Sequence, residues 1–308
     1  MTADPTTNTA DSAPTRPRTR WRMLLRIAVY AVLGFQVLLI LIAWLAGRSF
    51  IYYPTVTPIQ FIEGYGNRDG WSTLHTTMTD GTTLIGLRRT PAADARSAAP
   101  WIVYWGGNAA GITGNIDSLD TIRGDHDWGV ECHAYRGYDG SGGAPAEAAI
   151  IADASEIITR LERDAGVPPS RLVLFGRSLG TGVAVQQAAR LCDAGTPPAG
   201  VVLLSPYRSM WAMFDQATRP FPVGWAAADT WRSDAYVDRI TCPVLIVHGD
   251  RDEVIPLTHG RYLAARLGDR ARLVIVPGGT HNNMERAEAT LAIREFIAGQ
   301  SATQTAPR

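Results

Sequence analysis

RLVLFGRSLGTGVAVQQ, residues 171–187, carries one serine between two glycines where a predicted strand meets a predicted helix. The β-branched and aromatic run 171–175 predicts a short buried strand, and the apolar spacing over 183–191 predicts a helix. Between them, Gly176-Arg177-Ser178-Leu179-Gly180 matches G-x-S-x-G, in which small neighbours allow a serine on a sharp turn. The pattern favours Ser178 as a nucleophile over a plain glycine-rich link, and the rest of the chain has to choose between the two.

On either side of this stretch, short apolar runs alternate with helical patterns. A hairpin is predicted over 76–89, around the turn at Asp80-Gly81. Further strands are predicted at 101–105, 130–135, 201–204, 244–248 and 273–276, and helices at 146–165, 258–267 and 285–298. Continuous apolar strands separated by helices indicate a parallel sheet covered on both faces. The sequence therefore predicts an α/β fold with a mostly parallel, eight-stranded sheet flanked by helices.

The composition excludes several classes of protein. The 308 residues include 29 basic and 29 acidic side chains, so the zero formal net charge gives no reason to expect nucleic acid as a partner. Cys132, Cys192 and Cys242 lie far apart in the sequence without C-x-x-C spacing. They allow at most one disulfide, and they and the histidines show no metal-ligand spacing. We expect no metal site.

The N-terminal region contains a candidate membrane span. Residues 1–26 are predicted to form a disordered basic tail with five arginines, from Arg16 to Arg26. The next segment, 27–47, is uncharged and at about 1.5 Å per residue reaches about 31 Å, the thickness of a bilayer's hydrocarbon core. The arginine bias predicts a cytoplasmic N-terminus and an extracytoplasmic domain on the cell membrane. The alternatives are a cleaved signal peptide, although no A-x-A site follows, and a buried core helix.

Two later strand ends carry further polar side chains. HGDRDEVIP (248–256) supplies three carboxylates, and PGGTHNN (277–283) supplies His281. A serine hydroxyl is a poor nucleophile until a histidine accepts its proton, and that histidine needs a carboxylate to hold its tautomer. Because the carboxyl ends of parallel strands meet at one edge of the sheet, a serine, an acid and His281 in this chain order predict a catalytic triad.

The other histidines are weaker candidates for the base. His248 ends a strand but precedes the acid in the sequence instead of following it. His75, His126, His133 and His259 are predicted to be structural or solvated, because they lie near the hairpin, in a polar loop, in a strand and in a helix. The residues alone do not choose among the three carboxylates, Asp250, Asp252 and Glu253.

Several segments repeat motifs of a known family: FIYYP (50–54), GGNAAG (106–111), YRGYDGSGGAPAE (135–147), GRSLGTGVA (176–184), CPVLIVHGDRDEVIP (242–256) and GGTHNN (278–283). On these segments the chain, from about residue 50 to the last helix, resembles the membrane-anchored serine hydrolases of the α/β-hydrolase superfamily. That group includes lysophosphatidylserine lipase and protein depalmitoylases. The family's acid is the aspartate of H-G-x-x-D-x-[VI]-[VI]-P, so the resemblance implies Asp252 and leaves Asp250 and Glu253 as turn and surface residues.

The oxyanion hole is expected from two backbone N–H groups. One is that of Leu179, directly after the nucleophile, and the other comes from the loop after the strand at 101–105. Family members usually have H-G-N-A in that loop, and the resemblance implies the Asn108 N–H as the second donor. Glycine replaces histidine at position 106, which spares the backbone donor but removes the loop's usual brace. The glycine-rich YRGYDGSGG (135–143) lacks the G-K-[ST] of a P-loop and is assigned to architecture.

Residues 207–240, the lid segment, interrupt the alternation of strands and helices. The segment is rich in aromatic and methionine side chains, and an insertion after this strand covers the active site in such folds. The candidate acyl-pocket residues are Trp211, Met213, Phe214, Phe221 and Trp225. Ordinary packing of a helical crossover is the alternative interpretation.

Together these features predict a membrane-anchored serine hydrolase that cleaves a carboxylic ester or thioester of a lipid or other acyl substrate. Ser178, His281 and Asp252 would act through an acyl-enzyme without a cofactor. The predicted organisation is a tail over 1–26, a transmembrane helix over 27–47, a hydrolase domain over 48–300 and a frayed end over 301–308. An acyltransferase or a peptidase on the same triad stays open, as does a catalytically silent, membrane-tethered binding protein.

Overall fold

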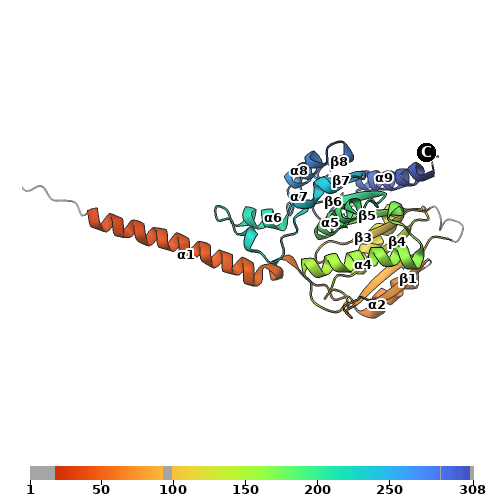
Figure 1. The fold of residues 1–308 in the computed structure, drawn as a ribbon, viewed down its shortest axis with the longest axis horizontal. Helices are drawn as coiled ribbons and strands as arrows, with labels where there is room; N and C mark the ends of the chain where they lie inside the picture. Colours follow the sequence, from red (N-terminus) through yellow and green to blue (C-terminus); the bar gives the residue numbers. More distant parts are fainter. Residues whose placement is uncertain (1–17, 69, 93–98, 285, 306–308) are drawn as a thin grey trace, which may run out of the picture.

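A computed structural model describes residues 18–68, 70–92, 99–284 and 286–305 of the chain. Its centre is an eight-stranded sheet in the order β1-β2-β4-β3-β5-β6-β7-β8 (Figure 1). β1 and β2 pair antiparallel, β2 pairs antiparallel with β4, and the strands from β4 to β8 are parallel. The predicted fold class is confirmed. The strands are β1 (Trp71–Thr77), β2 (Thr83–Arg89), β3 (Trp101–Trp105), β4 (Gly129–His133), β5 (Leu172–Arg177), β6 (Gly200–Leu204), β7 (Val244–Gly249) and β8 (Ala271–Val276).

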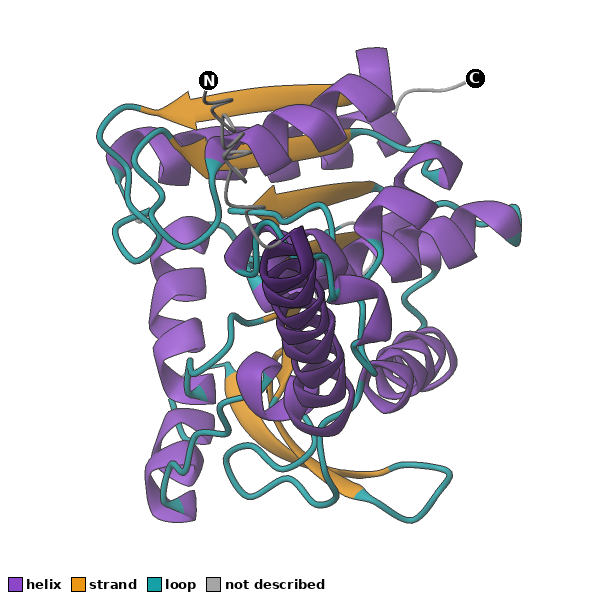
Figure 2. Cartoon of the chain, turned by 90° about the vertical axis from the view of Figure 1, so that its left-hand side faces the viewer, coloured by secondary structure: helices purple, strands orange, loops and turns teal. Residues whose placement is uncertain are grey.

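Helices cover both faces of the sheet (Figure 2). α3 and α9 pack against each other on one face, and α4 and α5 do so on the other. Every residue of β3, β4, β6 and β7 is buried, which explains why these strands appear as continuous apolar runs without alternation. The helices are α1 (Arg18–Ile51), α2 (Ile59–Gly66), α3 (Ile112–Arg123), α4 (Glu147–Ala165), α5 (Leu179–Asp193), α6 (Met210–Ala217), α7 (Ser233–Tyr236), α8 (Leu257–Leu267) and α9 (Ala287–Thr305).

Three predicted helix boundaries shift. α5 begins at Leu179 instead of residue 183, because its glycine-containing first turn continues directly from the serine turn. α1 begins at Arg18, inside the predicted tail, and extends beyond residue 47 to Ile51. α9 runs to Thr305, past the predicted helix end at 298. Residues 1–17 of the predicted tail over 1–26 and the last residues, 306–308, lie outside the described residues.

The long helix α1 projects from the body of the protein (Figures 1 and 2). The described residues include one helix, Trp21–Ile51, with the length and mean hydropathy (2.4) to cross a membrane. The C-terminal end of α1 is joined to the lid segment through the buried carboxylate of Asp229. Asp229 accepts a hydrogen bond from the Tyr52 hydroxyl at 2.8 Å and pairs with Arg48 at 3.1 Å, while the Trp231 indole donates to Tyr52. The position of α1 on the domain is therefore held by specific polar contacts.

Candidate active site

Ser178 lies on a sharp turn between β5 and α5. Its backbone (φ 48°, ψ −115°) is in a region that residues other than glycine rarely adopt, as is found at strained functional turns. A Cβ on Gly176 would overlap the backbone of Gly180, and a Cβ on Gly180 would overlap the carbonyl group of Trp105. Both glycines are therefore required by close backbone approach, which supports the nucleophile interpretation of the G-x-S-x-G pattern over a plain link.

Substituting Gly180 by alanine is expected to lower the free energy of unfolding by about 3 kcal/mol, because the added methyl group must displace β3 backbone. The matched control is Gly114→Ala in α3, where a Cβ meets nothing within 4 Å. That change should leave stability unchanged or raise it by up to about 1 kcal/mol, since alanine favours helix. Denaturant unfolding of the detergent-solubilised protein measures both, and equal effects of the two changes would contradict the packing argument.

The structure brings Ser178, His281 and Asp252 into one hydrogen-bonded chain. His281 follows β8, and its Nε2 lies 3.0 Å from the Ser178 Oγ. Asp252 follows β7, and its Oδ2 and Oδ1 lie 2.9 and 3.1 Å from the His281 Nδ1. With Nδ1–H donating to the carboxylate, Nε2 is the free base that faces the serine hydroxyl. The geometry can therefore transfer a proton from serine to histidine.

The carboxylate of Asp252 is fully buried, but hydrogen bonds from the protein stabilise its negative charge. Burial would raise its pKa, but the hydrogen bonds from His281 and from the Ile255 N–H hold that pKa below its ordinary value. The Val254 N–H adds a hydrogen bond at 3.0 Å. Asp252 is therefore ionised at neutral pH, as an acid that orients an imidazolium must be.

The competing residues occupy other positions. His248 is buried below the acid, where its Nε2 lies 2.8 Å from the Ile255 carbonyl, and burial lowers its pKa. Asp250 accepts a hydrogen bond from the Gly278 N–H, and Glu253 accepts one from the His281 N–H. All three thus support the loops that carry Asp252 and His281 without reaching the serine.

The two predicted oxyanion donors lie beside the serine. Leu179 is the first residue of α5, so its N–H is one that the helix leaves without an intrahelical acceptor. Gly107 and Asn108 line the same cavity as Ser178, and a Cβ on Gly107 would lie 3.5 Å from the Ser178 Cβ. The loop after β3 therefore passes close enough to the nucleophile to present a backbone N–H to a substrate oxygen.

Other side chains brace this loop in place of the absent histidine. The Tyr135 hydroxyl donates to the Gly106 carbonyl at 2.7 Å, and the Tyr138 hydroxyl donates to the Asn108 Oδ1 at 2.9 Å. The Asn108 side chain also donates to the Ile51 carbonyl at the end of α1. Both tyrosines belong to the glycine-rich segment 135–143, which was predicted to be structural. Nothing in its sequence indicated that they contact the oxyanion loop.

A cavity of about 750 Å³ opens above Ser178. Met213 and Phe214 line it, as predicted from the sequence. Its other apolar side chains lie at or just after the end of α1, in or just before α6, and in the loop after β7: Phe50, Ile51, Tyr53, Tyr207, Met210, Ala217, Val254 and Ile255. Apart from Met210, one of the methionines of the lid segment, none of these was expected in the cavity. The remaining three predicted pocket residues lie elsewhere: Trp211 is on the opposite side of α6, Phe221 packs against Phe35 of α1, and Trp225 is 55% exposed.

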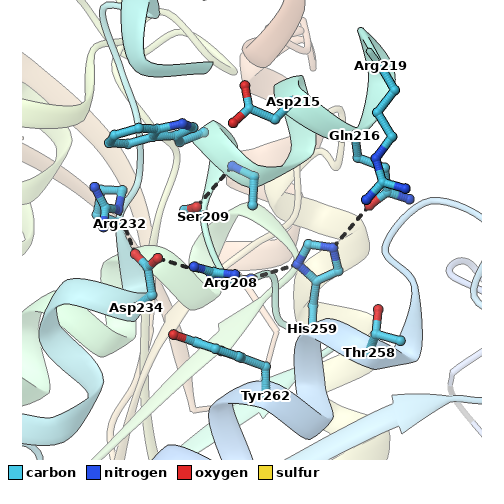
Figure 3. Close-up of a pocket in the computed structure, with 12 residues that line it drawn as sticks. Arg208, Ser209, Asp215, Gln216, Arg219, Arg232, Asp234, Thr258, His259 and Tyr262 are labelled. Carbon is cyan, nitrogen blue, oxygen red and sulfur yellow. Dashed lines mark hydrogen bonds and ion pairs between the residues drawn. The ribbon is translucent and has the colours of Figure 1, made fainter. Parts of the chain in front are cut away.

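A second cavity of about 670 Å³ lies on the other side of α6 (Figure 3). Its wall is polar: Asp234 pairs with both Arg208 and Arg232, and His259 accepts a hydrogen bond from the Arg208 N–H. The helix α6 therefore separates an apolar cavity at the serine from a polar one behind it. Within the described residues, no group of three or more His, Cys, Asp or Glu side chains could hold a metal ion.

A sheet of this order, with a serine on the turn after β5 and helices on both faces, defines an α/β hydrolase. The profile of the prolyl oligopeptidase family matches residues 148–301, which is half of the chain. The chain belongs to this family of α/β hydrolases.

Similar proteins come from bacteria and animals. Rv2307c of Mycobacterium tuberculosis is 28% identical over 283 residues, which cover 90% of this chain and 96% of that protein. The lysophosphatidylserine lipase ABHD12 of Danio rerio is 33% identical over 184 residues, 54% of this chain and 47% of the lipase. The matched region is therefore about half the length of that lipase.

The solved structures with the same fold include esterases. Est1E of Butyrivibrio proteoclasticus with ferulic acid bound has a TM-score of 0.62 and 20% identity, covering 73% of this chain and 98% of its own. The esterase Pf2001 of Pyrococcus furiosus has a TM-score of 0.63 and 13% identity, covering 81% and 97%. At these identities the likeness shows the fold alone.

Proposed function

We propose that the protein is a membrane-anchored serine hydrolase that cleaves a carboxylic ester or thioester through an acyl-enzyme on Ser178. The observation that carries the proposal is the hydrogen-bonded chain from the Ser178 Oγ through His281 to the buried Asp252. An unreactive structural serine needs neither a strained backbone nor a histidine whose second nitrogen is held by a buried carboxylate.

In the first half-reaction the Ser178 Oγ attacks the substrate carbonyl while His281 Nε2 takes the hydroxyl proton. The negative charge that develops on the carbonyl oxygen would be stabilised by the N–H groups of Leu179 and Asn108. The tetrahedral species then collapses, the C–O or C–S bond to the leaving group breaks, and His281 returns the proton to that group. In the second half-reaction a water molecule repeats the attack on the acyl-enzyme and releases the acid and Ser178.

The chemistry of the cavity supports an acyl substrate. Its walls are predominantly apolar and include two methionines, Met210 and Met213, which adapt to flexible chains. One of the relatives is a lysophosphatidylserine lipase, so a lipid ester is within the chemistry of similar proteins. This combination favours an acyl ester over a peptide as the substrate, and an intact triad geometry disfavours a silent binding protein.

The helix α1 supports the membrane location. Its apolar stretch and the arginines before residue 27 favour a single-pass anchor with the N-terminus in the cytoplasm and the hydrolase domain, 48–300, outside. The stretch over 27–47 would then be the transmembrane segment, and part of the lid segment over 207–240 would lie beside it.

A series of p-nitrophenyl esters tests the substrate class. We expect kcat/KM of the full-length protein in detergent to rise at least about tenfold from acetate to octanoate, because each buried methylene contributes about 0.8 kcal/mol. The measurement uses monomeric substrate concentrations, with detergent alone as the blank. A flat response or a preference for acetate would rule out the acyl-pocket assignment while leaving the hydrolase assignment in place.

A further inference from the structure

The loop after α6 lies against the middle of the candidate membrane span. In this lid loop, residues 218–226, the Phe221 ring packs edge-on against Phe35 at 5.2 Å between centroids. The Gln36 side-chain amide donates to the Pro222 carbonyl at 2.9 Å. Gln36 is 11 residues before Gly47 in the sequence, which is about 16 Å along a helix, or about half of the hydrocarbon thickness. A helix that spans the membrane over 27–47 therefore carries the tip of this loop to the level of the bilayer's middle.

The backbone of the lid loop is suited to a medium without water. Hydrocarbon offers no hydrogen bonds, so irregular backbone survives there only if the protein satisfies its polar groups. Asp215 accepts from the N–H groups of Val223 and Gly224, at 2.9 and 2.7 Å, and Pro220 and Pro222 have no N–H to satisfy. Two further N–H groups, of Phe221 and Ala226, donate to the carbonyls of Thr218 and Val223. The Gln36 NH₂ group, a polar group within an apolar helix, likewise donates a hydrogen bond to the loop.

The exposed side chains of the loop follow the expected change of polarity with depth. At the level of Gly47, where the span ends, Ala227 lies against α1. A Cβ built on Gly47 would be 3.8 Å from the Ala227 Cβ. Trp225, two residues before, is 55% exposed beside α1, and tryptophan is enriched at membrane interfaces. Further into the span the exposed residues of the loop are Pro220, Pro222 and Arg219, whose side chain turns towards the polar cavity. The loop thus places an indole near the interface and an uncharged side chain deeper.

One charged residue of the loop turns away from this apolar side. Arg219 points into the polar cavity behind α6, towards Gln216 and His259 (Figure 3). A long arginine side chain can keep its head at a polar level while its stem covers apolar surface. The polar cavity behind α6 therefore accommodates the Arg219 guanidinium, the charged group of the lid loop that would otherwise face hydrocarbon.

The mouth of the Ser178 cavity lies at the same boundary. Its rim includes Phe50 and Tyr53, which are 56% and 52% exposed, and Val254, which is 47% exposed. Phe50 is three residues beyond Gly47, about 4.5 Å further along α1. An ester at the headgroup level would meet this rim with its acyl chain still in the membrane.

We propose that the lid loop enters the outer leaflet together with α1, down to the middle of the bilayer, and that the Ser178 cavity draws acyl lipids directly from that leaflet. This inference rests on the proposed anchoring and hydrolase function. The ligand it implies is a membrane lipid with an ester near the headgroup and a hydrocarbon chain. A water-dispersed ester would not use this path.

The depth of the loop is measured without reference to activity. A nitroxide is attached to Pro222→Cys and, as the matched control, to Leu291→Cys on α9, at the end of the molecule remote from α1 (Figure 1). Both full-length variants are reconstituted in phosphatidylcholine vesicles, and label on the native cysteines is subtracted with the wild type. We expect dissolved oxygen to relax the label at 222 and an aqueous nickel chelate to relax the label at 291. A label at 222 that the chelate reaches as readily as at 291 would overturn the inference.

Substrate access is tested with a charge on the loop. Pro222→Asp should lower the rate on a diacyl lipid embedded in vesicles at least about tenfold, because a carboxylate resists entry into hydrocarbon. The same variant should keep kcat/KM for p-nitrophenyl butyrate in detergent within about twofold, as expected of a surface change outside the cavity. Leu291→Asp is the control and should change neither rate.

Equal losses on both substrates, or no loss on the vesicle lipid, would contradict access from the leaflet. A wild-type protein that cleaves neither substrate would defeat the proposed function, while the nitroxide measurement would still show where the loop lies.

Discussion

Replacing Ser178 by alanine is expected to lower kcat for ester hydrolysis by about four orders of magnitude or more, since the acyl-enzyme cannot form without the hydroxyl. The His281 Nε2, 3.0 Å from the Oγ, would lose its reaction partner, while the cavity and the oxyanion donors would remain. The measurement is the steady-state rate on a p-nitrophenyl ester, together with covalent labelling of the full-length protein by a fluorophosphonate. Labelling should be complete in the wild type and absent in Ser178→Ala.

The matched control is Ser118→Ala, which removes a half-buried serine from α3, on a different part of the domain. Its rate and labelling should equal those of the wild type. Labelling that persists in Ser178→Ala would show that a different nucleophile reacts. A folded wild-type protein that takes no label would leave only the binding-protein alternative.

Replacing Asp252 by asparagine is expected to lower kcat/KM by about 10³- to 10⁴-fold at neutral pH. In the wild type the His281 Nδ1 faces two oxygens of the ionised Asp252 carboxylate, at 2.9 and 3.1 Å. An amide in that place can offer its NH₂ group to the ring nitrogen, favouring the tautomer that carries its proton on Nε2. The base would then have no lone pair facing Ser178, and the imidazolium would lose its counter-charge.

Two neighbouring carboxylates provide controls for this prediction. Asp250→Asn and Glu253→Gln change acids that accept hydrogen bonds from the backbone N–H groups of Gly278 and His281. Because they act only through loop position, their kcat/KM should stay within about tenfold of the wild type, a loss of up to about 1.4 kcal/mol. A larger loss in either than in Asp252→Asn would reassign the acid of the triad.

The strands and the serine turn were accessible to sequence reasoning because their signals are local. A continuous apolar run such as Trp101–Trp105 indicates a strand buried on both faces, and it coincides with β3. Glycines at 176 and 180 are required by contacts with nearby backbone, so they appear in the sequence as a motif. Helix ends were less accessible: α5 begins four residues earlier than the spacing of its apolar residues indicated.

The composition of the cavity was less accessible, because it depends on which face of a short helix turns towards the serine. Trp211 and Met213 are both soft apolar residues of the lid segment, yet α6 presents Met213 to the serine cavity and Trp211 to the polar one. Neighbours two apart on a helix point in different directions, and the orientation of α6 is set by its packing in the folded molecule. Tyr135 and Tyr138, which brace the oxyanion loop, were missed because their partners Gly106 and Asn108 are 29 and 30 residues away in the sequence.

The amino-acid sequence alone determined three features: the class of fold, the serine turn and the order of the candidate triad along the chain. Each of them is visible in local periodicity and short motifs. Only the folded molecule shows that α1 and the lid segment lie side by side, with Gln36 bonded to Pro222 across an interval of 186 residues. No local pattern specifies such a contact, because its stability comes from matching surfaces that meet only after the sheet has formed. The same long-range packing makes the end of α1 a wall of the cavity above Ser178.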